Sequence, residues 1–140
     1  DIVYEISLDV ENYKYFLLEL FMGGSYDNPI TIRYIRLNGI EIDFSTLKDI
    51  ATKAGDHSTG QFDVVVGEKT LTLDLHRCTN YSQGFRVKST SSDTGFIGFS
   101  LENVYTVDIG LVFTTSAYRY FNEVVITLFT QEVDVWTLGQ

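Results

Sequence analysis

The chain lacks most of the features by which a sequence reveals a specific chemistry. It has one cysteine, so neither an intramolecular disulfide nor a multi-cysteine metal site can form. It has one proline, so almost nothing interrupts its extended segments. It contains no apolar run of transmembrane length, no phosphate loop, no zinc-ligand spacing and no dinucleotide fingerprint.

Cationic residues are also scarce. Ten Lys and Arg stand against nineteen Asp and Glu, which gives a net charge of −9. Nucleic acids and anionic lipids bind clustered cations. The sequence therefore predicts no nucleic-acid partner and no membrane insertion, and it leaves neutral or cationic partners open.

Aromatic residues, by contrast, are abundant. The chain has ten Phe, nine Tyr and one Trp, and its aromatic share is 14%. Tyr populates binding surfaces because one end of its side chain is apolar and the other polar. Nine Tyr exceed what a core of this size requires, so we expect some of these rings to face a partner.

The clearest local signal is a hairpin between residues 30 and 44, which read ITIRYIRL-NG-IEIDF. The pair Asn38-Gly39 suits a two-residue type I′ turn, because both central residues need positive φ. After the turn, apolar and acidic residues alternate strictly, as in a strand with one buried face. The same rhythm recurs almost to the C-terminus, up to a last predicted strand at Glu132–Leu138.

About ten such strands separated by turns predict an all-β fold. We expect one domain over residues 1–140, built as an antiparallel two-sheet β-sandwich with a jelly-roll-like arrangement. Polar residues from Cys78 to Gly84 predict a loop between strands. The segment 46–54 is the one helix candidate: Ser45 can cap its N-terminus, apolar residues follow at helical spacing, and Gly55 can end it.

Catalytic constellations are weak, and the sequence predicts that the protein is not an enzyme. Glu19 lies inside the apolar run LLELF, with Asp74, Glu102, Asp108 and Glu123 as potential partner acids for glycoside hydrolysis. The favoured interpretation is that Glu19 faces solvent or pairs with Arg33 or Arg36. His76 and Cys78 are two residues apart, but no oxyanion motif accompanies them.

No cofactor is expected. A structural calcium ion is kept as an alternative, because Asp27, Asn28, Asp56 and Asp93 occupy predicted polar loops and offer the oxygen ligands that calcium takes. Loop aspartates are common for turn reasons alone, and no EF-hand spacing is present.

Aromatic and polar side chains gather in two predicted connections and near the C-terminus. Sugar rings stack on aromatic rings, and amide or guanidinium groups bind their hydroxyls. The sequence therefore predicts a non-catalytic carbohydrate-binding module that recognises a polysaccharide or oligosaccharide. Its predicted ligand-binding residues are Tyr118, Arg119, Tyr120, Tyr81, Gln83, Asn122 and Trp136.

A second function of a different class stays open. Long strands and few prolines also suit a self-assembling subunit of a virion, tail fibre or extracellular appendage, which would associate through edge strands. The chain begins at Asp1 rather than Met. We therefore expect a processed or excised module that acts outside the cell or at its surface.

Overall fold

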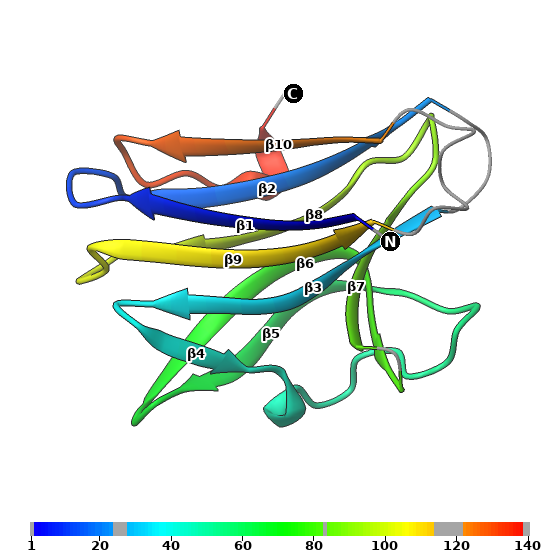
Figure 1. Cartoon of the computed structure of the whole chain (residues 1–140), viewed down its shortest axis with the longest axis horizontal. Coiled ribbons are helices and arrows are strands. Elements are labelled where there is room, and N and C mark those ends of the chain that lie inside the picture. The colour runs from blue at the N-terminus through cyan, green and yellow to red at the C-terminus, as the bar shows by residue number, and fades with distance from the viewer. Residues whose placement is uncertain (1, 24–27, 83, 114–121, 139–140) are drawn as a thin grey trace.

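The computed structural model describes residues 2–23, 28–82, 84–113 and 122–138, and these residues are almost entirely antiparallel strands (Figure 1). In this part of the chain, no helix is long and apolar enough to cross a membrane. The elements are β1 (Ile2–Asp9), β2 (Tyr15–Met22), β3 (Asn28–Leu37), β4 (Ile40–Asp43), η1 (Phe44–Thr46), β5 (Ser58–Val66), β6 (Lys69–Tyr81), β7 (Gly84–Ser89), β8 (Gly95–Ser100), β9 (Thr106–Phe113), β10 (Asn122–Phe129) and η3 (Val135–Thr137).

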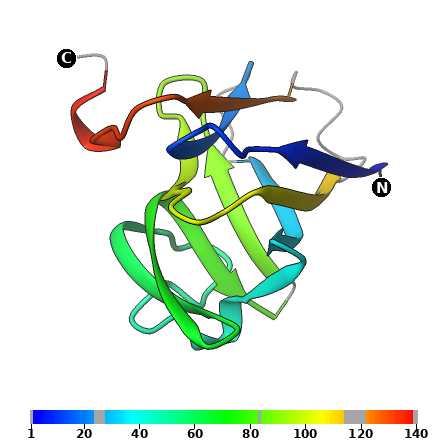
Figure 2. The ribbon, with the colours of Figure 1, turned by 90° about the vertical axis from the view of Figure 1, so that its left-hand side faces the viewer.

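The strands form one hydrogen-bonded path that curls into two layers (Figure 2). Its order is β1-β9-β3-β4-β5-β6-β8-β2-β10, and β7 pairs with both β3 and β6. One layer contains β1, β9 and β3, and the other contains β10, β2, β8, β6 and β5. The all-β sandwich predicted from the sequence is confirmed.

The core lies between these layers because alternate side chains of each strand point inward. Phe16 of β2 and Phe99 of β8 are both fully buried, and their rings stack at 4.7 Å. They meet aliphatic residues of the opposite layer in one continuous hydrophobic cluster. Each such buried side chain contributes about 1.5–3 kcal/mol through its removal from water.

The predicted type I′ hairpin is confirmed. Asn38 and Gly39 have φ of 52° and 81°, and Leu37 pairs with Ile40 across the turn. The turn also anchors a distant loop: Asn38 Nδ2 donates to the Asn103 carbonyl at 2.9 Å, and its Oδ1 accepts from Tyr105 N at 2.7 Å. Its side chain therefore does more than permit the turn.

The predicted α-helix at residues 46–54 is wrong. Only Phe44–Thr46 forms a 3₁₀ turn, and Asp49 has φ 65°, which a right-handed helix excludes. The carbonyl of Ala51 accepts from Asn80 N at 2.9 Å, and that of Ala54 accepts from Lys88 Nζ. These carbonyl groups therefore bond to β6 and to the buried Lys88, and they are not available for helical hydrogen bonds.

Two other sequence-based boundaries need correction. The sequence predicts a loop at residues 78–81, but these residues continue β6. Cys78 and Thr79 are fully buried there, so this part of the strand packs into the core. The predicted last strand, Glu132–Leu138, contains the 3₁₀ turn η3 instead, and Asp134 caps it by accepting from Trp136 N. Alternation alone does not distinguish a strand from a short capped turn.

Candidate functional site

A groove opens where one edge of β3 changes partners. Residues 28–32 of β3 pair with β7, and residues 36–37 pair with β4 along the same edge. A register shift against β9 between Ile32 and Tyr34 makes Arg33 a bulge residue. The gap between the two partners is a groove of about 590 Å³, called the β3 groove below, which is lined by Thr31, Ile32, Arg33, Glu41, Ile42, Asp43, Phe44, Asn80, Gly84 and Phe85.

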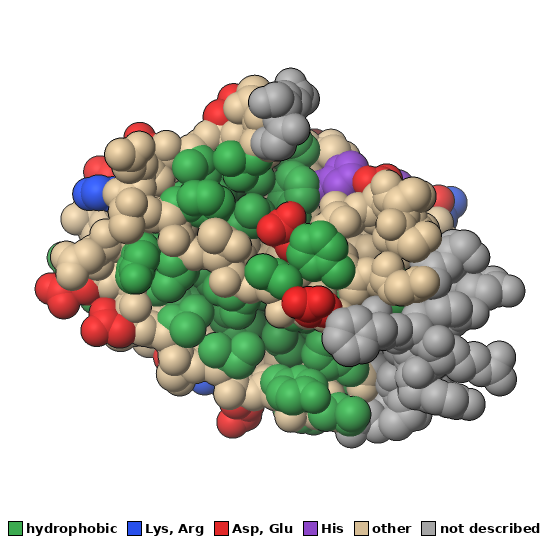
Figure 3. Space-filling view, turned by 90° about the horizontal axis from the view of Figure 1, so that it is seen from above, with side chains coloured by type: hydrophobic (Ala, Val, Ile, Leu, Met, Phe, Trp, Pro, Cys, Tyr) green, Lys and Arg blue, Asp and Glu red, His purple; other side chains and the backbone are tan. Residues whose placement is uncertain are grey.

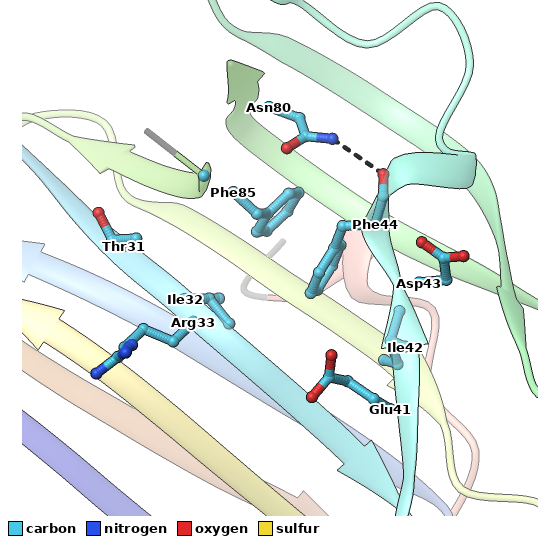
Figure 4. A pocket seen from close by; sticks show the side chains of 10 residues that line it. Thr31, Ile32, Arg33, Glu41, Ile42, Asp43, Phe44, Asn80 and Phe85 are labelled. Carbon is cyan, nitrogen blue, oxygen red and sulfur yellow. Dashed lines mark hydrogen bonds between the residues drawn. The ribbon is translucent and has the colours of Figure 1, made fainter. Parts of the chain in front are cut away.

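Two phenyl rings form the apolar part of this groove (Figure 4). Phe44 and Phe85 stack with centroids 4.3 Å apart and planes inclined by 15°. Phe85 is buried, whereas Phe44 stays partly exposed. Asn80 Nδ2 donates to the Phe44 carbonyl at 2.9 Å, which fixes the chain as it leaves β4. Stacking on Phe85 fixes the ring of Phe44, and the hydrogen bond from Asn80 fixes its backbone.

Polar side chains surround the rings. Asp43 Oδ1 accepts from Ser45 N at 3.1 Å, so one carboxylate oxygen caps η1. Glu41 is exposed and its carboxylate lies 3.6 Å from Arg36 Nε. Arg33 is exposed at the rim and makes no ion pair with any described residue. The β3 groove thus offers acceptors and a guanidinium beside an aromatic surface.

A second groove, of about 650 Å³, lies at the end of the sandwich. It runs between the β3–β4 hairpin, the β5–β6 turn and the connection from β8 to β9, and no aromatic side chain lines it. Because sugar recognition needs a ring surface, the β3 groove is the better candidate despite its smaller volume.

Two predicted ligand-binding rings are described, and they lie far apart. Trp136 contacts Phe96 with centroids at 5.4 Å, and its Nε1 donates to Asp74 Oδ1 at 3.1 Å. Tyr81 is half-buried, with the Arg86 guanidinium 4.9 Å from its ring centroid. Asp74 and Tyr81 are seven residues apart on β6, roughly 20 Å along a strand. Trp136 and Tyr81 therefore do not form one flat platform.

The remaining predicted site residues fall outside what the structure describes. Gln83, Tyr118, Arg119 and Tyr120 belong to the undescribed segments, and of Asn122 only the backbone is described. Their predicted role in ligand binding stays a prediction. The sequence does not predict the β3 groove, because Arg33 and Phe44 look like ordinary strand residues in it; the gap arises only from the tertiary pairing of β3.

A polar cluster occupies the outer face of β5 and β6. His76 Nε2 lies 2.7 Å from Asp93 Oδ1, and Arg77 Nη1 donates to Asp93 Oδ2 at 3.3 Å. The hydrogen bond from His76, with the charges of both partners, lowers the pKa of Asp93. Asp93 is committed to these contacts, and no group of three potential metal ligands occurs among the described residues.

Cys78 is unsuited to nucleophilic chemistry. Its side chain is fully buried, and its Sγ donates to the carbonyls of His76 and Phe96. Burial raises the pKa of the thiol far above its ordinary value, so no thiolate forms near neutral pH.

Glu19 lies on the outer face of β2, between Phe96 of β8 and Val125 of β10 in register. It does not meet Arg33 or Arg36, which belong to β3 in the other layer. Desolvation raises the pKa of this carboxyl group.

Comparisons of the chain with family models, curated proteins and solved structures found no match, so the function is inferred from the geometry of the molecule alone.

Proposed function

We propose that this protein is a non-catalytic module that binds a neutral glycan in the β3 groove. The observation that carries the proposal is the gap in β3 pairing, which leaves the Phe44 ring in a groove that Arg33, Glu41 and Asn80 also line. The apolar C–H face of a sugar ring packs on such a ring, while its hydroxyls pair with carboxylate, amide and guanidinium groups.

Size and charge support the same class of ligand. A groove of about 590 Å³ lies within the range of small-ligand sites and holds a few sugar residues. The net charge of −9 repels polyanions but not neutral polysaccharides. Such polymers are met outside cells, so the proposal includes an extracellular or cell-surface location. Tyr118, Arg119 and Tyr120 lie outside the described residues, and their predicted part in glycan binding stays a separate prediction.

The proposal is tested by affinity electrophoresis of the whole chain against soluble glucans and mannans, with a polyanionic pectate for contrast. We expect retardation by at least one neutral glycan and none by pectate. Arg33→Ala should weaken binding about tenfold, since a charge-assisted hydrogen bond to ligand is lost. Arg33 has no described ion pair, so this variant should fold as the parent does.

A matched control comes from the other end of the sandwich. Lys69 is an exposed cation beside the β5–β6 turn, in the lining of the aromatic-free groove. Lys69→Ala should leave glycan binding unchanged. Absence of retardation by every neutral glycan, with the protein folded by circular dichroism, would refute the proposal. Equal effects of the two substitutions would mean that the ligand does not use the β3 groove.

A structural role is the second candidate, and one observation favours it. β1 is an edge strand whose first residues are apolar on both faces: Ile2, Val3 and Tyr4 are 53%, 49% and 47% exposed. Sheet edges of this kind pair with other chains. Sedimentation equilibrium at high concentration distinguishes the candidates, because a self-assembling subunit forms oligomers and a soluble glycan-binding module stays monomeric.

A further inference from the structure

β10 ends the described strand order, and no described strand pairs with its outer edge. It pairs with β2 over all eight residues from Asn122 to Phe129 without a register shift. Natural edge strands are protected by lysine, proline or a bulge. β10 has none of these, and its inward-facing residues Val124, Ile126 and Leu128 are only partly buried.

The outer face beside this edge combines apolar side chains with carboxylates. One row across the sheet runs Phe96–Glu19–Val125, and the next row places Phe21 beside Glu123. Phe21 is 38% exposed. Glu19 makes no hydrogen bond or ion pair with any described residue, although it is partly buried. A partly desolvated carboxylate without a partner is a costly feature for an isolated domain.

The strands of this half of the sandwich contain no cation to balance these acids; the described Lys14 precedes β2 and lies beside Phe129, at the opposite end of β10 from Glu123. β1, β2, β8, β9 and β10 contain no Lys or Arg at all. Figure 3 looks onto the side where β10 lies, and there hydrophobic side chains surround isolated acidic groups, with basic groups only towards the rim. The chemistry of the face is therefore complementary to an apolar segment that carries positive charge.

We propose that the free edge of β10 receives an extended, basic polypeptide segment as an added antiparallel strand. The segment places apolar residues over Val124, Ile126 and Leu128, and it places Lys or Arg at the alternate, outward positions opposite Val125 and Glu123. This is strand addition, in which main-chain hydrogen bonds give affinity and alternate side chains give specificity.

The spacing of strands lets such a cation reach Glu19. Neighbouring strands lie about 4.8 Å apart, so the added strand lies about 10 Å from β2. A Lys or Arg side chain opposite Val125 extends across that single strand towards the Glu19 carboxylate, and one opposite Glu123 meets its carboxylate directly. A second copy of this chain fits poorly, because β1 and β10 would both bring further carboxylates.

The test uses the full chain and synthetic eight-residue peptides labelled for fluorescence anisotropy. The probe alternates valine at the inward positions with two lysines opposite Val125 and Glu123, and a matched peptide has glutamate in place of lysine. We expect the lysine peptide to bind at least about tenfold more tightly, which corresponds to about 1.4 kcal/mol. A lysine peptide with a central proline should not bind, because it cannot complete the strand ladder.

Variants locate the contact. Glu19→Gln should weaken binding of the lysine peptide about three- to tenfold and should not weaken binding of the glutamate peptide, whose repulsion by Glu19 it removes. Glu68→Gln, in the exposed β5–β6 turn, should change neither. The proposal is overturned if the two peptides bind equally, or if Glu19→Gln has no more effect than Glu68→Gln. It is also overturned if sedimentation shows a dimer that Val125→Lys abolishes, since the edge then belongs to a second copy.

Discussion

The hydroxyl of Tyr15 donates to Asp74 Oδ2 at 2.6 Å, which ties β2 to β6 across the intervening β8. The same carboxylate accepts from Gln61 Nε2 at 2.9 Å and from Trp136 Nε1 at 3.1 Å. One aspartate thus joins β5, β6, β2 and the C-terminal turn η3.

Asp74→Ala should therefore be one of the most destabilising surface substitutions in the chain. It removes the acceptor of three donors, two of them on partly or fully buried rings, and the expected loss is about 2–4 kcal/mol. Urea denaturation measures it. Asp63→Ala is the matched control, because the side chain of Asp63 accepts from just one described residue, through the exposed Thr72 hydroxyl at 2.8 Å. Similar losses for the two variants would contradict the special role of Asp74.

Alkaline pH should destabilise the fold through Tyr15. Burial, and then the hydrogen bond to Asp74, raise the pKa of its hydroxyl far above the ordinary value. The folded state therefore holds the phenolic proton more tightly than the unfolded state, and stability falls as pH rises above about 10. Tyr15→Phe should flatten this alkaline decline, as followed by denaturation at several pH values. An unchanged slope would assign the decline to other groups.

Gly98 should not tolerate a side chain. A Cβ there would meet the Tyr15 hydroxyl at 2.2 Å, because the ring of Tyr15 lies over this residue. Gly98→Ala should cost about 2–4 kcal/mol by displacing that ring. Gly55→Ala is the control: a Cβ at Gly55 meets nothing within 4 Å, so its effect should be near zero or slightly stabilising. Thermal melts of both variants measure the difference.

Acidification should release the contact of Asp93 with His76. Because the hydrogen bond to His76 lowers the pKa of Asp93, its contribution to stability is present above about pH 4 and is lost as pH falls through the lowered pKa. The side chain is 48% exposed, so the contribution is about 1 kcal/mol or less. Asp93→Asn should be less stable than the parent at pH 6, and the difference should shrink as pH falls below about 4; a difference that does not shrink on acidification would contradict this origin.

Glu19→Gln should stabilise the isolated protein while it weakens peptide binding. Desolvation raises the pKa of Glu19, so the folded state favours the protonated form, and the ionised carboxylate costs stability once pH rises through that pKa. The side chain is partly buried and not fully enclosed, so the gain at neutral pH is a few tenths to about 1 kcal/mol. It should vanish at low pH. A destabilised variant would show that Glu19 has a stabilising partner.

The strand pattern could be predicted because it is local. Alternation between Ile40 and Phe44 and the Asn38-Gly39 pair determine a hairpin without reference to the rest of the chain. The segment 46–54 could not be predicted in the same way. Its apolar residues do follow helical spacing. However, the carbonyl of Ala51 accepts a hydrogen bond from β6 and that of Ala54 accepts one from Lys88, and both donors are distant in sequence. Tertiary hydrogen bonds override local propensity there.

The candidate site was harder to predict than the fold. Surplus rings were expected to mark it, and of the described ones Trp136 contacts Phe96 and Asp74, while Tyr81 packs beside Arg86. The β3 groove arises from a change of strand partner beside the bulge at Arg33, and neither feature leaves a signal in a single sequence. The apolar neighbours of Glu19 mark it as unusual in the sequence, but its place on the outer face of β2, beside the edge strand β10, depends on the strand order.

The segregation of cations has a kinetic consequence. Apart from Lys14 and Arg119, every Lys and Arg lies between Arg33 and Lys88, so the folded chain is an electric dipole whose negative pole contains β10. The electric field would orient a positively charged partner and this pole towards each other before the two surfaces touch. Added salt should then slow their encounter much more than it shortens the lifetime of the complex.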